Sequence, residues 1–434
     1  MAGIILAYVW RFHILAPGME ALRISAILTG ASWAFLLLAP RWEHMSRALR
    51  LPFVWLYIGV LFWALAGYSF GLDPQSSFLE LRDVHLRNLL FMLFVLGTVS
   101  TYVRLEVAMM ANAFGAAVLA FYYIKGGTPT MWTPVSTYDR NDMALLFNMC
   151  LPIAFWLLVE QKTRWAKVGF GLLAASLGYS VLMSQSRGGF LGLSAILLYF
   201  MVTEKTIPIR YRLGPVAIAA VGLFFLPAEV QDRLRTLTSL EQDYNYDSST
   251  GRVEIWKRGL GYVQDRPLFG VGIDNFSEAE ATISDRARML GGRVNGQVAH
   301  NSYLEITAET GYPGGVMYLG LVVSLLAWLV TWRNRLKRWR NRGGPRLHAL
   351  YRLTNCMTAS TIGFALGSFF LSTFSLSLLV MLVCLSATTI TVSSKALRSV
   401  QRGRRGPKNG ARRRVRRPPA VVGAPREPVI LQSG

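Results

Sequence analysis

The sequence predicts an all-α integral membrane protein, and three observations lead to this fold class. Hydrophobic residues make up 52% of the 434 residues and charged residues only 16%, whereas soluble domains are about one quarter charged. The apolar residues gather in long runs of the length that crosses a bilayer core, about 20 residues. Lysine and arginine concentrate in alternate connections between these runs, as expected of a chain that crosses a membrane repeatedly.

About twelve apolar runs predict transmembrane helices. The first run contains Arg11 and His13. A removable signal peptide is the alternative there, but no small-residue cleavage site follows a basic start. We therefore expect a membrane helix at this position as well. The expected spans cover residues 3–17, 24–40, 52–71, 87–102, 106–124, 142–160, 165–183, 187–203, 212–228, 312–333, 353–371 and 374–392.

The basic residues predict the orientation of the chain, because short loops rich in lysine and arginine stay in the cytoplasm. The loop 333–352 and the tail after residue 393 supply most of the formal net charge of +22. The long segment 228–300 holds eleven acids and nine bases. We therefore expect both termini in the cytoplasm and this segment on the periplasmic side of a bacterial inner membrane.

These observations divide the chain into four parts. The expected parts are transmembrane helices 1–9 in residues 1–227, a periplasmic loop with catalytic elements in 228–311, helices 10–12 in 312–392, and a basic, disordered cytoplasmic tail in 393–434. The arginine-rich tail fits either nucleic acid binding or an arm lying against anionic lipid headgroups. We favour the lipid-bound arm and expect no nucleic acid partner.

The expected periplasmic loop contains signals for further helices. We predict a short helix over 229–240 and a second over 251–263, after the candidate N-caps Ser248, Ser249 and Thr250. The second helix would lie on the membrane surface or over the spans, because one side of it carries the apolar residues Ile255, Trp256, Leu260 and Val263. Arg266 and Pro267 would end it, and Gly270 and Gly272 would form a tight connection.

The segment HNSYLEITAETG reads as the start of the helix that enters the membrane. Asn301 or Ser302 would cap it, with acidic residues in its first turns at Glu305 and Glu309. Gly311, Gly314 and Gly315 then predict a kink at the entry to the tenth span.

His300, directly before this helix, is the candidate general base. A neutral imidazole at that place can take a proton from a sugar hydroxyl. The alternative is a structural histidine that caps the helix or hydrogen-bonds a neighbour. The three cysteines, by contrast, lack metal-binding spacing and are expected to be small buried side chains: Cys150, Cys356 and Cys384.

Several arginines are expected on the same face as His300. Arg187 lies between two spans, where a guanidinium either snorkels to the headgroups or binds phosphate in bidentate fashion. Gly188 and Gly189 would let a ligand approach the backbone. Arg252 lies near a helix N-terminus, which also favours anions.

Other expected cations on this face are Arg140, Arg82 and Arg87. Ion pairs with nearby carboxylates are the alternative reading for these arginines. The candidate partners are Asp83, Asp139 and Asp142.

The sequence contains no zinc-binding spacing, no HExxH and no Walker loop, and GVGIDNF lacks the strand–turn–helix context of a dinucleotide site. We therefore expect no metal and no cofactor. A transfer reaction would have to use a donor that is already activated.

The chain resembles the O-antigen ligases and the related O-antigen polymerase superfamily. Arg187 and Leu191 match the family pattern Arg-x3-Leu, and the pattern His-[Asn/Ser/Gln]-x9-Gly-x2-Gly is matched by His300, Asn301, Gly311 and Gly314. Gly251, Arg252 and Trp256 also look like a family pattern. The twelve spans and the large loop extend the resemblance over nearly the whole chain.

The resemblance implies metal-independent, inverting transfer of a glycan from undecaprenyl pyrophosphate to a sugar hydroxyl of lipid A–core. His300 would activate the hydroxyl, while Arg187 and Arg252 would bind the pyrophosphate and stabilise its growing charge. Arg140 and Asn301 are additional candidates for substrate binding. A polymerase or a protein O-oligosaccharyltransferase with the same donor, or a transporter of lipid-linked glycans, remains an alternative.

Overall fold

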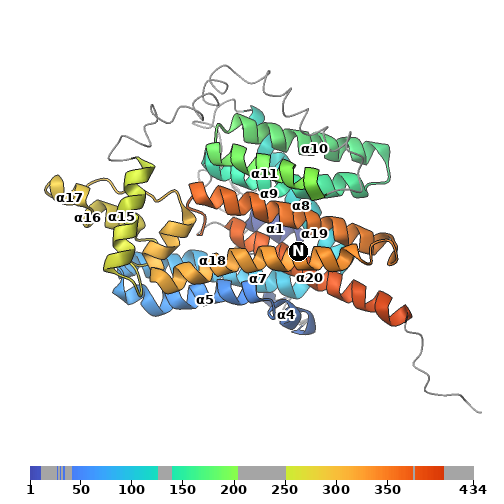
Figure 1. Ribbon diagram of the computed structural model, residues 1–434, viewed down its shortest axis with the longest axis horizontal. Helices are drawn as coiled ribbons and strands as arrows, with labels where there is room; N and C mark the ends of the chain where they lie inside the picture. Colours follow the sequence, from blue (N-terminus) through green and yellow to red (C-terminus); the bar gives the residue numbers. More distant parts are fainter. Residues whose placement is uncertain are drawn as a thin grey trace, which may run out of the picture.

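The computed structural model describes residues 1–10, 42–125, 139–203, 251–374 and 377–404, with four isolated positions between 27 and 34. All regular secondary structure in these residues is helical (Figure 1), which confirms the predicted fold class. Six of the described helices are long and apolar enough to cross a membrane. The chain is thus a multi-pass membrane protein.

Six helices meet the length and hydropathy of a span: α5 (Pro52–Gly67, extended by the turn η2, Tyr68–Phe70), α8 (Tyr102–Lys125), α9 (Arg140–Glu160), α10 (Arg164–Met183), α18 (Ser302–Lys337) and α20 (Ser377–Arg404). Five others complete the described bundle, namely α1 (Ala2–Tyr8), α4 (Trp42–Ala48), α7 (Leu86–Thr98), α11 (Arg187–Thr203) and α19 (Gly344–Gly367). Short elements follow at one end: α6 (Pro74–Glu80), η3 (Leu81–His85), α15 (Arg252–Asp265), α16 (Phe276–Thr282), α17 (Asp285–Met289) and η5 (Ser368–Phe370).

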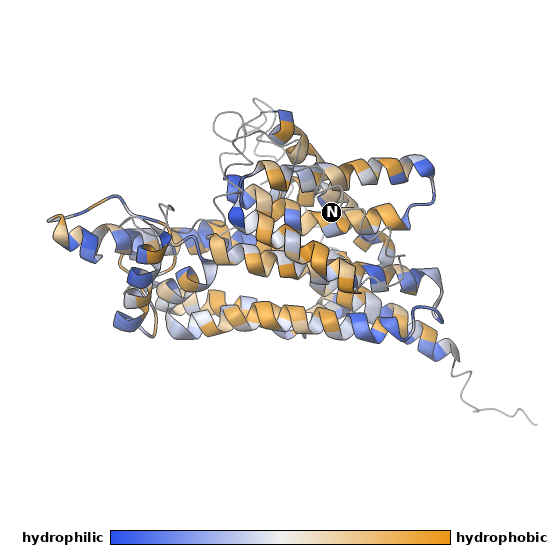
Figure 2. Ribbon diagram, turned by 45° about the horizontal axis from the view of Figure 1, so that its top comes forward, coloured by the Kyte–Doolittle hydropathy of each residue, from blue (hydrophilic) through white to orange (hydrophobic). Residues whose placement is uncertain are grey.

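The bundle is built around α18, α19 and α20. α18 packs along α5 and α19, α9 packs along α10 and α19, and α20 contacts α7, α8, α18 and α19. α20 is almost completely buried, because 94% of its most apolar window lies inside the protein. Figure 2 shows hydrophobic residues along the middle of the bundle and hydrophilic residues toward its two ends.

The two ends of the bundle differ in what they carry. The end that carries α15, α16 and α17 also holds the N-terminus of α18, and we call it the His300 end (Figure 1). The other end, called the opposite end, holds the C-terminus of α18 and the N-terminus of α19. There Arg352 of α19 forms an ion pair of 3.0 Å with Glu160 of α9.

The predicted start and kink of the tenth span are both confirmed. Asn301 is the N-cap of α18, and its side chain accepts hydrogen bonds from the backbone N–H groups of Tyr303 and Leu304. Gly311 interrupts the helix with a φ of 71°. A Cβ at this position would collide with the carbonyl of Leu268, so only glycine fits the kink.

Helices α15 and α20 differ from the predicted helices in where they begin or end. α15 begins after Gly251, so the predicted side-chain caps Ser248, Ser249 and Thr250 are wrong. It packs against α18, as predicted for a helix lying over the spans; Ile255 and Val263 are buried, while Leu260 is exposed. α20 continues to Arg404, twelve residues past the predicted end of that span at residue 392.

Other predictions fall outside the described residues or are confirmed. The expected helices at 212–228 and 229–240, and most of the span 24–40, lie outside the described residues. The total of about twelve spans and the four-part division therefore stay predictions. The three cysteines are buried and free, as expected.

Candidate active site at one end of the helix bundle

The segment that carries His300 is held on both sides. Upstream, the indole Nε1 of Trp256 in α15 donates a hydrogen bond of 2.9 Å to the carbonyl of Ala299. Downstream, Asn301 caps α18 and the hydroxyl of Ser302 donates to the carbonyl of Leu371 at 2.5 Å. Bonds from two distant parts of the chain therefore fix the backbone on either side of His300.

His300 itself adopts a φ of 48°, in the left-handed region that a residue with a Cβ seldom occupies. Such a conformation costs about 1–3 kcal/mol and persists only where the surroundings enforce it. The flanking hydrogen bonds supply that enforcement. Strained residues of this kind cluster at active sites and ligand clamps.

The surroundings of His300 favour the neutral form of its imidazole. Burial lowers the pKa of His300, and the positive charge of Arg252 lowers it further, while Asp139 raises it. Arg252 is the first residue of α15 and Asp139 precedes α9. The structure thus brings together His300 and Arg252, as predicted, and adds Asp139 as an electrostatic neighbour of the imidazole.

Asp139 and Asp142 form a capping box at the N-terminus of α9. The Asp139 carboxylate accepts from the backbone N–H groups of Asn141 and Asp142, at 2.7 and 2.8 Å. Asp142 accepts in return from the N–H of Asp139, at 3.2 Å. Both carboxylates thus cap the backbone of α9, and Arg140 lies in the first turn of this helix. Ion pairs of Asp139 and Asp142 with arginines stay a prediction.

Arg187 occupies the first position of α11, and a tight turn leads into it. Gln185 has a φ of 54°, and the hydroxyl of Ser186 accepts from the N–H of Gly189 at 3.1 Å. The expectation that Gly188 and Gly189 leave room for a ligand is wrong. A Cβ at Gly188 would meet Phe370, and one at Gly189 would meet Ala144, so the protein itself fills this space.

Aromatic contacts connect the Arg187 region to the His300 segment. Phe370, which packs on Gly188, contacts Phe369 with ring centroids 5.3 Å apart. Phe369 in turn contacts Trp256 edge-to-face at 5.4 Å. Trp256 is the residue that holds the carbonyl of Ala299. The N-termini of α11, α15 and α18 therefore meet around η5.

The remaining predicted cations at this end are engaged elsewhere. Arg82 makes two hydrogen bonds to Asp83, at 2.9 and 2.7 Å. Arg87 approaches the same carboxylate at 3.6 Å. These exposed groups form a surface ion-pair cluster, which confirms the alternative reading for Asp83. His85, nearby in sequence, is only 1% exposed and packs on the ring of Phe374.

Acidic residues form a second feature of this end that sequence reasoning missed in part. Glu309 of α18 accepts from the N–H of Phe276 at 3.2 Å. Asp274 has a φ of 61°, and burial raises its pKa, while a hydrogen bond from Ser76 opposes the shift. The neighbouring Asn275 accepts from the N–H of Asp73 at 2.6 Å. The sequence GVGIDN, which contains Asp274 and Asn275, was the local signal for a tight turn at the point where these residues contact Asp73 and Ser76.

In the described ranges, no three His, Cys, Asp or Glu side chains are grouped as a metal site would require. The structure describes two other histidines, one in α4 and one in α19. His44, in α4, is buried, and His348, in α19, contacts Tyr351.

The central part of the chain is similar to known proteins. Residues 171–319 match the family model described as "O-Antigen ligase". The chain is 27% identical over 254 residues to "Exopolysaccharide production protein ExoQ" of Rhizobium meliloti (strain 1021), covering 52% of this chain and 53% of that protein. It is 22% identical over 195 residues to an uncharacterized protein of Haemophilus influenzae, covering 42% and 48%. The chain thus spans about half the length of the curated relatives it matches.

Proposed function

We propose that this chain, whose residues 171–319 match the O-antigen ligase family model, is a glycosyltransferase. It would transfer O-antigen glycan from undecaprenyl pyrophosphate to a sugar hydroxyl of lipid A–core, at the periplasmic face of the inner membrane. The observation that carries the proposal is His300, a partly buried imidazole in a strained conformation, whose pKa is lowered by burial and by the charge of Arg252. All three proposed catalytic residues lie inside the matched range.

In the proposed reaction, His300 takes the proton of the acceptor hydroxyl as its oxygen attacks the anomeric carbon of the donor sugar. The bond from that carbon to the pyrophosphate oxygen breaks, and the electron pair leaves with undecaprenyl pyrophosphate. Arg187 and Arg252 bind the pyrophosphate and stabilise its growing negative charge. A single displacement from the opposite side inverts the anomeric configuration.

The charge distribution supports the proposed orientation. The basic segment 333–352 lies at the opposite end, and residues 393–404 form the last part of α20 at the same end. Neither segment contains an acidic residue. By the positive-inside rule this end would face the cytoplasm, and His300 would face the periplasm. Arg140, in the first turn of α9, would then add charge for the donor, and Asn301 would position His300 through its helix cap.

A second candidate function is a polymerase that uses the same class of donor. The name of the R. meliloti relative, an exopolysaccharide production protein, favours it. The two functions differ in the acceptor only, since a polymerase would join one lipid-linked glycan to another.

Lipopolysaccharide from a deletion strain separates the two candidates on a gel. A ligase predicts loss of all capped core with accumulation of long lipid-linked polymer. Core that still carries a single repeat unit would identify a polymerase instead, and an unchanged gel would contradict both.

Purified full-length protein with donor and acceptor tests the chemistry directly. Product formed without added nucleotide would support a transferase and contradict a transporter. His300→Ala should abolish measurable transfer, whereas His348→Ala, the same substitution at the opposite end, should leave it unchanged. Full activity of His300→Ala would overturn the assignment of the base.

A further inference from the structure

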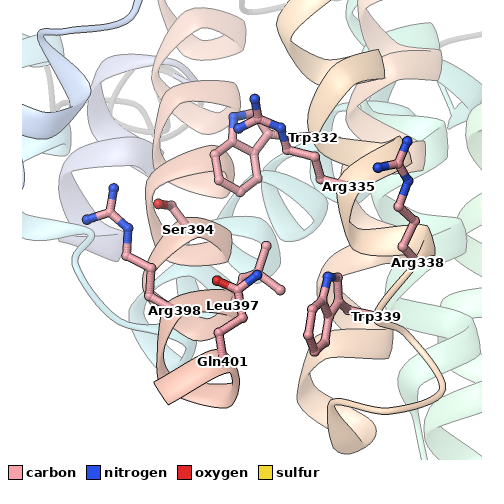
Figure 3. Close-up of a pocket in the computed structure, with 8 residues that line it drawn as sticks. All are labelled: Trp332, Arg335, Arg338, Trp339, Ser394, Leu397, Arg398 and Gln401. Carbon is pink, nitrogen blue, oxygen red and sulfur yellow. The ribbon is translucent and has the colours of Figure 1, made fainter. Parts of the chain in front are cut away.

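A cationic pocket lies at the opposite end of the bundle, between the last turns of α18 and α20. Its cavity has a volume of about 390 Å³. Arg335 near the end of α18, Arg338 directly after it and Arg398 on α20 line the pocket. Figure 3 shows Trp332 and Trp339 on the α18 side, the guanidinium of Arg335 beside Trp332, and the Arg338 and Arg398 side chains pointing outward from the two edges of the pocket. None of these residues belongs to the site around His300.

The positive charge of this pocket has no local counter-charge. Residues 328–352 and 393–404 contain no aspartate or glutamate. None of the salt bridges between described residues involves Arg335, Arg338 or Arg398. Three arginines that line one cavity raise the local positive potential and attract an anion.

Trp332 positions one of these arginines. It is 8% exposed, and the guanidinium of Arg335 lies over its ring, 5.2 Å from the centroid. A guanidinium held at the wall of the pocket can donate to phosphate oxygens.

The position of the pocket identifies the source of the phosphate. α18 and α20 are both candidate membrane spans, and the pocket lies where their apolar stretches give way to basic residues. Leu397 contributes an apolar wall beside the arginines. Tryptophan and arginine at the end of a span are typical of the membrane–water interface, and basic pockets between spanning helices bind anionic headgroups.

We propose that this pocket binds the phosphate headgroup of an anionic phospholipid in the leaflet at the opposite end. Arg335 donates to the phosphate, and the positive charges of Arg338 and Arg398 at the edges of the pocket attract it. The acyl chains extend along the lipid-facing apolar surface of α18, whose most apolar window is only 39% buried. This lipid is separate from the donor and acceptor of the proposed transfer.

Native mass spectrometry of the full-length protein in mild detergent tests the proposal. Phosphatidylglycerol and phosphatidylcholine are titrated separately, and the fraction of protein that retains lipid is measured. The wild type should retain phosphatidylglycerol in preference to phosphatidylcholine. The variant Arg335→Gln/Arg338→Gln/Arg398→Gln should lose this preference, with the affinity falling about fivefold for each arginine removed.

A charge-matched control separates the pocket from the general basicity of this end. Lys337→Gln/Lys395→Gln/Arg402→Gln removes three charges from the same two helices, and none of these residues lines the pocket. It should bind phosphatidylglycerol like the wild type. Equal loss in both triple variants, or retention in the pocket variant, would overturn the proposal.

Two further measurements distinguish a lipid site from a free-anion site and cover the case of a misfolded triple variant. Inorganic phosphate at millimolar concentration should not displace phosphatidylglycerol, and efficient displacement would identify a free-anion site instead of a lipid site. If the triple variant does not elute as a single folded species, Arg335→Gln and Arg398→Gln are measured singly. Each should lower affinity about fivefold, and an unchanged affinity in both would reject the site.

Discussion

At the scale of the residue, His300 shows how neighbours far apart in the sequence tune one imidazole. Burial and Arg252 lower its pKa, and Asp139 acts in the opposite direction. A lowered pKa means that the neutral, proton-accepting form dominates at pH 7 and is lost only as the pH falls below the ordinary value of 6.5. The proposed base is therefore available over the whole neutral range.

We expect the pH–rate profile of transfer to be flat through pH 7 and to fall only on its acid side. Asp139→Asn removes the influence that raises the pKa of His300, so the acid limb should move to lower pH. Asparagine is also a good N-cap, so α9 should remain folded. The measurement is kcat/KM against pH for purified protein. An acid limb that stays in place or moves to higher pH would contradict the electrostatic role of Asp139.

The arginines lead to a second prediction at this scale. Arg187→Ala and Arg252→Ala should each lower kcat/KM with the lipid-linked donor by about 10²–10³-fold, because a donor to the developing negative charge is lost. Arg288→Ala, on the exposed face of α17, serves as the matched control. Donor affinity and turnover are both measured. Wild-type values for both site variants would show that Arg187 and Arg252 do not bind the pyrophosphate.

At the scale of the element, the kink of α18 depends on Gly311. Its φ of 71° and the nearby carbonyl of Leu268 both exclude a side chain. The helix start at Asn301 and the membrane-spanning part after Pro313 therefore run in different directions, and this geometry presents His300 at the end of the bundle.

Gly311→Ala should lower stability by about 1–3 kcal/mol, since it forces an alanine into a left-handed conformation against a carbonyl. Gly320→Ala, in the regular part of the same helix, meets only ordinary contacts with Leu56 at 3.5 Å and should be neutral or slightly stabilising. Thermal unfolding in detergent compares the two. Equal melting temperatures would show that the kink is not required.

A buried ion pair stabilises the packing of α15 against α16. Arg258 donates to Glu280 at 2.7 Å, and the hydroxyl of Tyr262 donates to the same carboxylate at 2.9 Å. Glu280 is only 1% exposed. Removing one partner of such a pair costs about 3–5 kcal/mol, because the other charge stays buried without compensation.

Glu280→Gln should therefore make the α15–α17 region much more susceptible to limited proteolysis with trypsin. Glu278→Gln, which breaks the exposed pair with Arg293, should have little effect because surface pairs contribute about 0–1 kcal/mol. Identical cleavage rates in both variants would show that the buried pair does not hold this region.

At the scale of the whole molecule, the distribution of charge along the bundle predicts its orientation in the membrane. Basic residues gather at the opposite end, and the His300 end carries both acids and bases. All three native cysteines are buried. A single cysteine introduced at one end of the bundle can therefore be labelled to show on which side of the membrane that end lies.

Met289→Cys, at a position 84% exposed on α17, should react with a membrane-impermeant maleimide in intact cells whose outer membrane is permeabilised. Lys337→Cys, at the opposite end, should react only after the inner membrane is opened. The reverse pattern would invert the proposed orientation and place His300 in the cytoplasm.

The sequence by itself determined the elements of this protein. Run length and composition predicted the all-α fold, and local signals predicted the Asn301 cap, the Gly311 kink and the end of α15 near Pro267. These features depend on residues within a few positions of one another, because helices, caps and kinks follow local backbone chemistry. The same reasoning selected His300 and Arg252 as candidates.

Only the tertiary structure decided which of these elements meet. It brought Asp139 to His300 across 161 positions, made Trp256 the residue that holds Ala299, and filled the space beside Gly188 and Gly189 with Phe370 and Ala144. It also set three arginines around one pocket. Such contacts arise from helix packing between distant segments, and no local pattern encodes them.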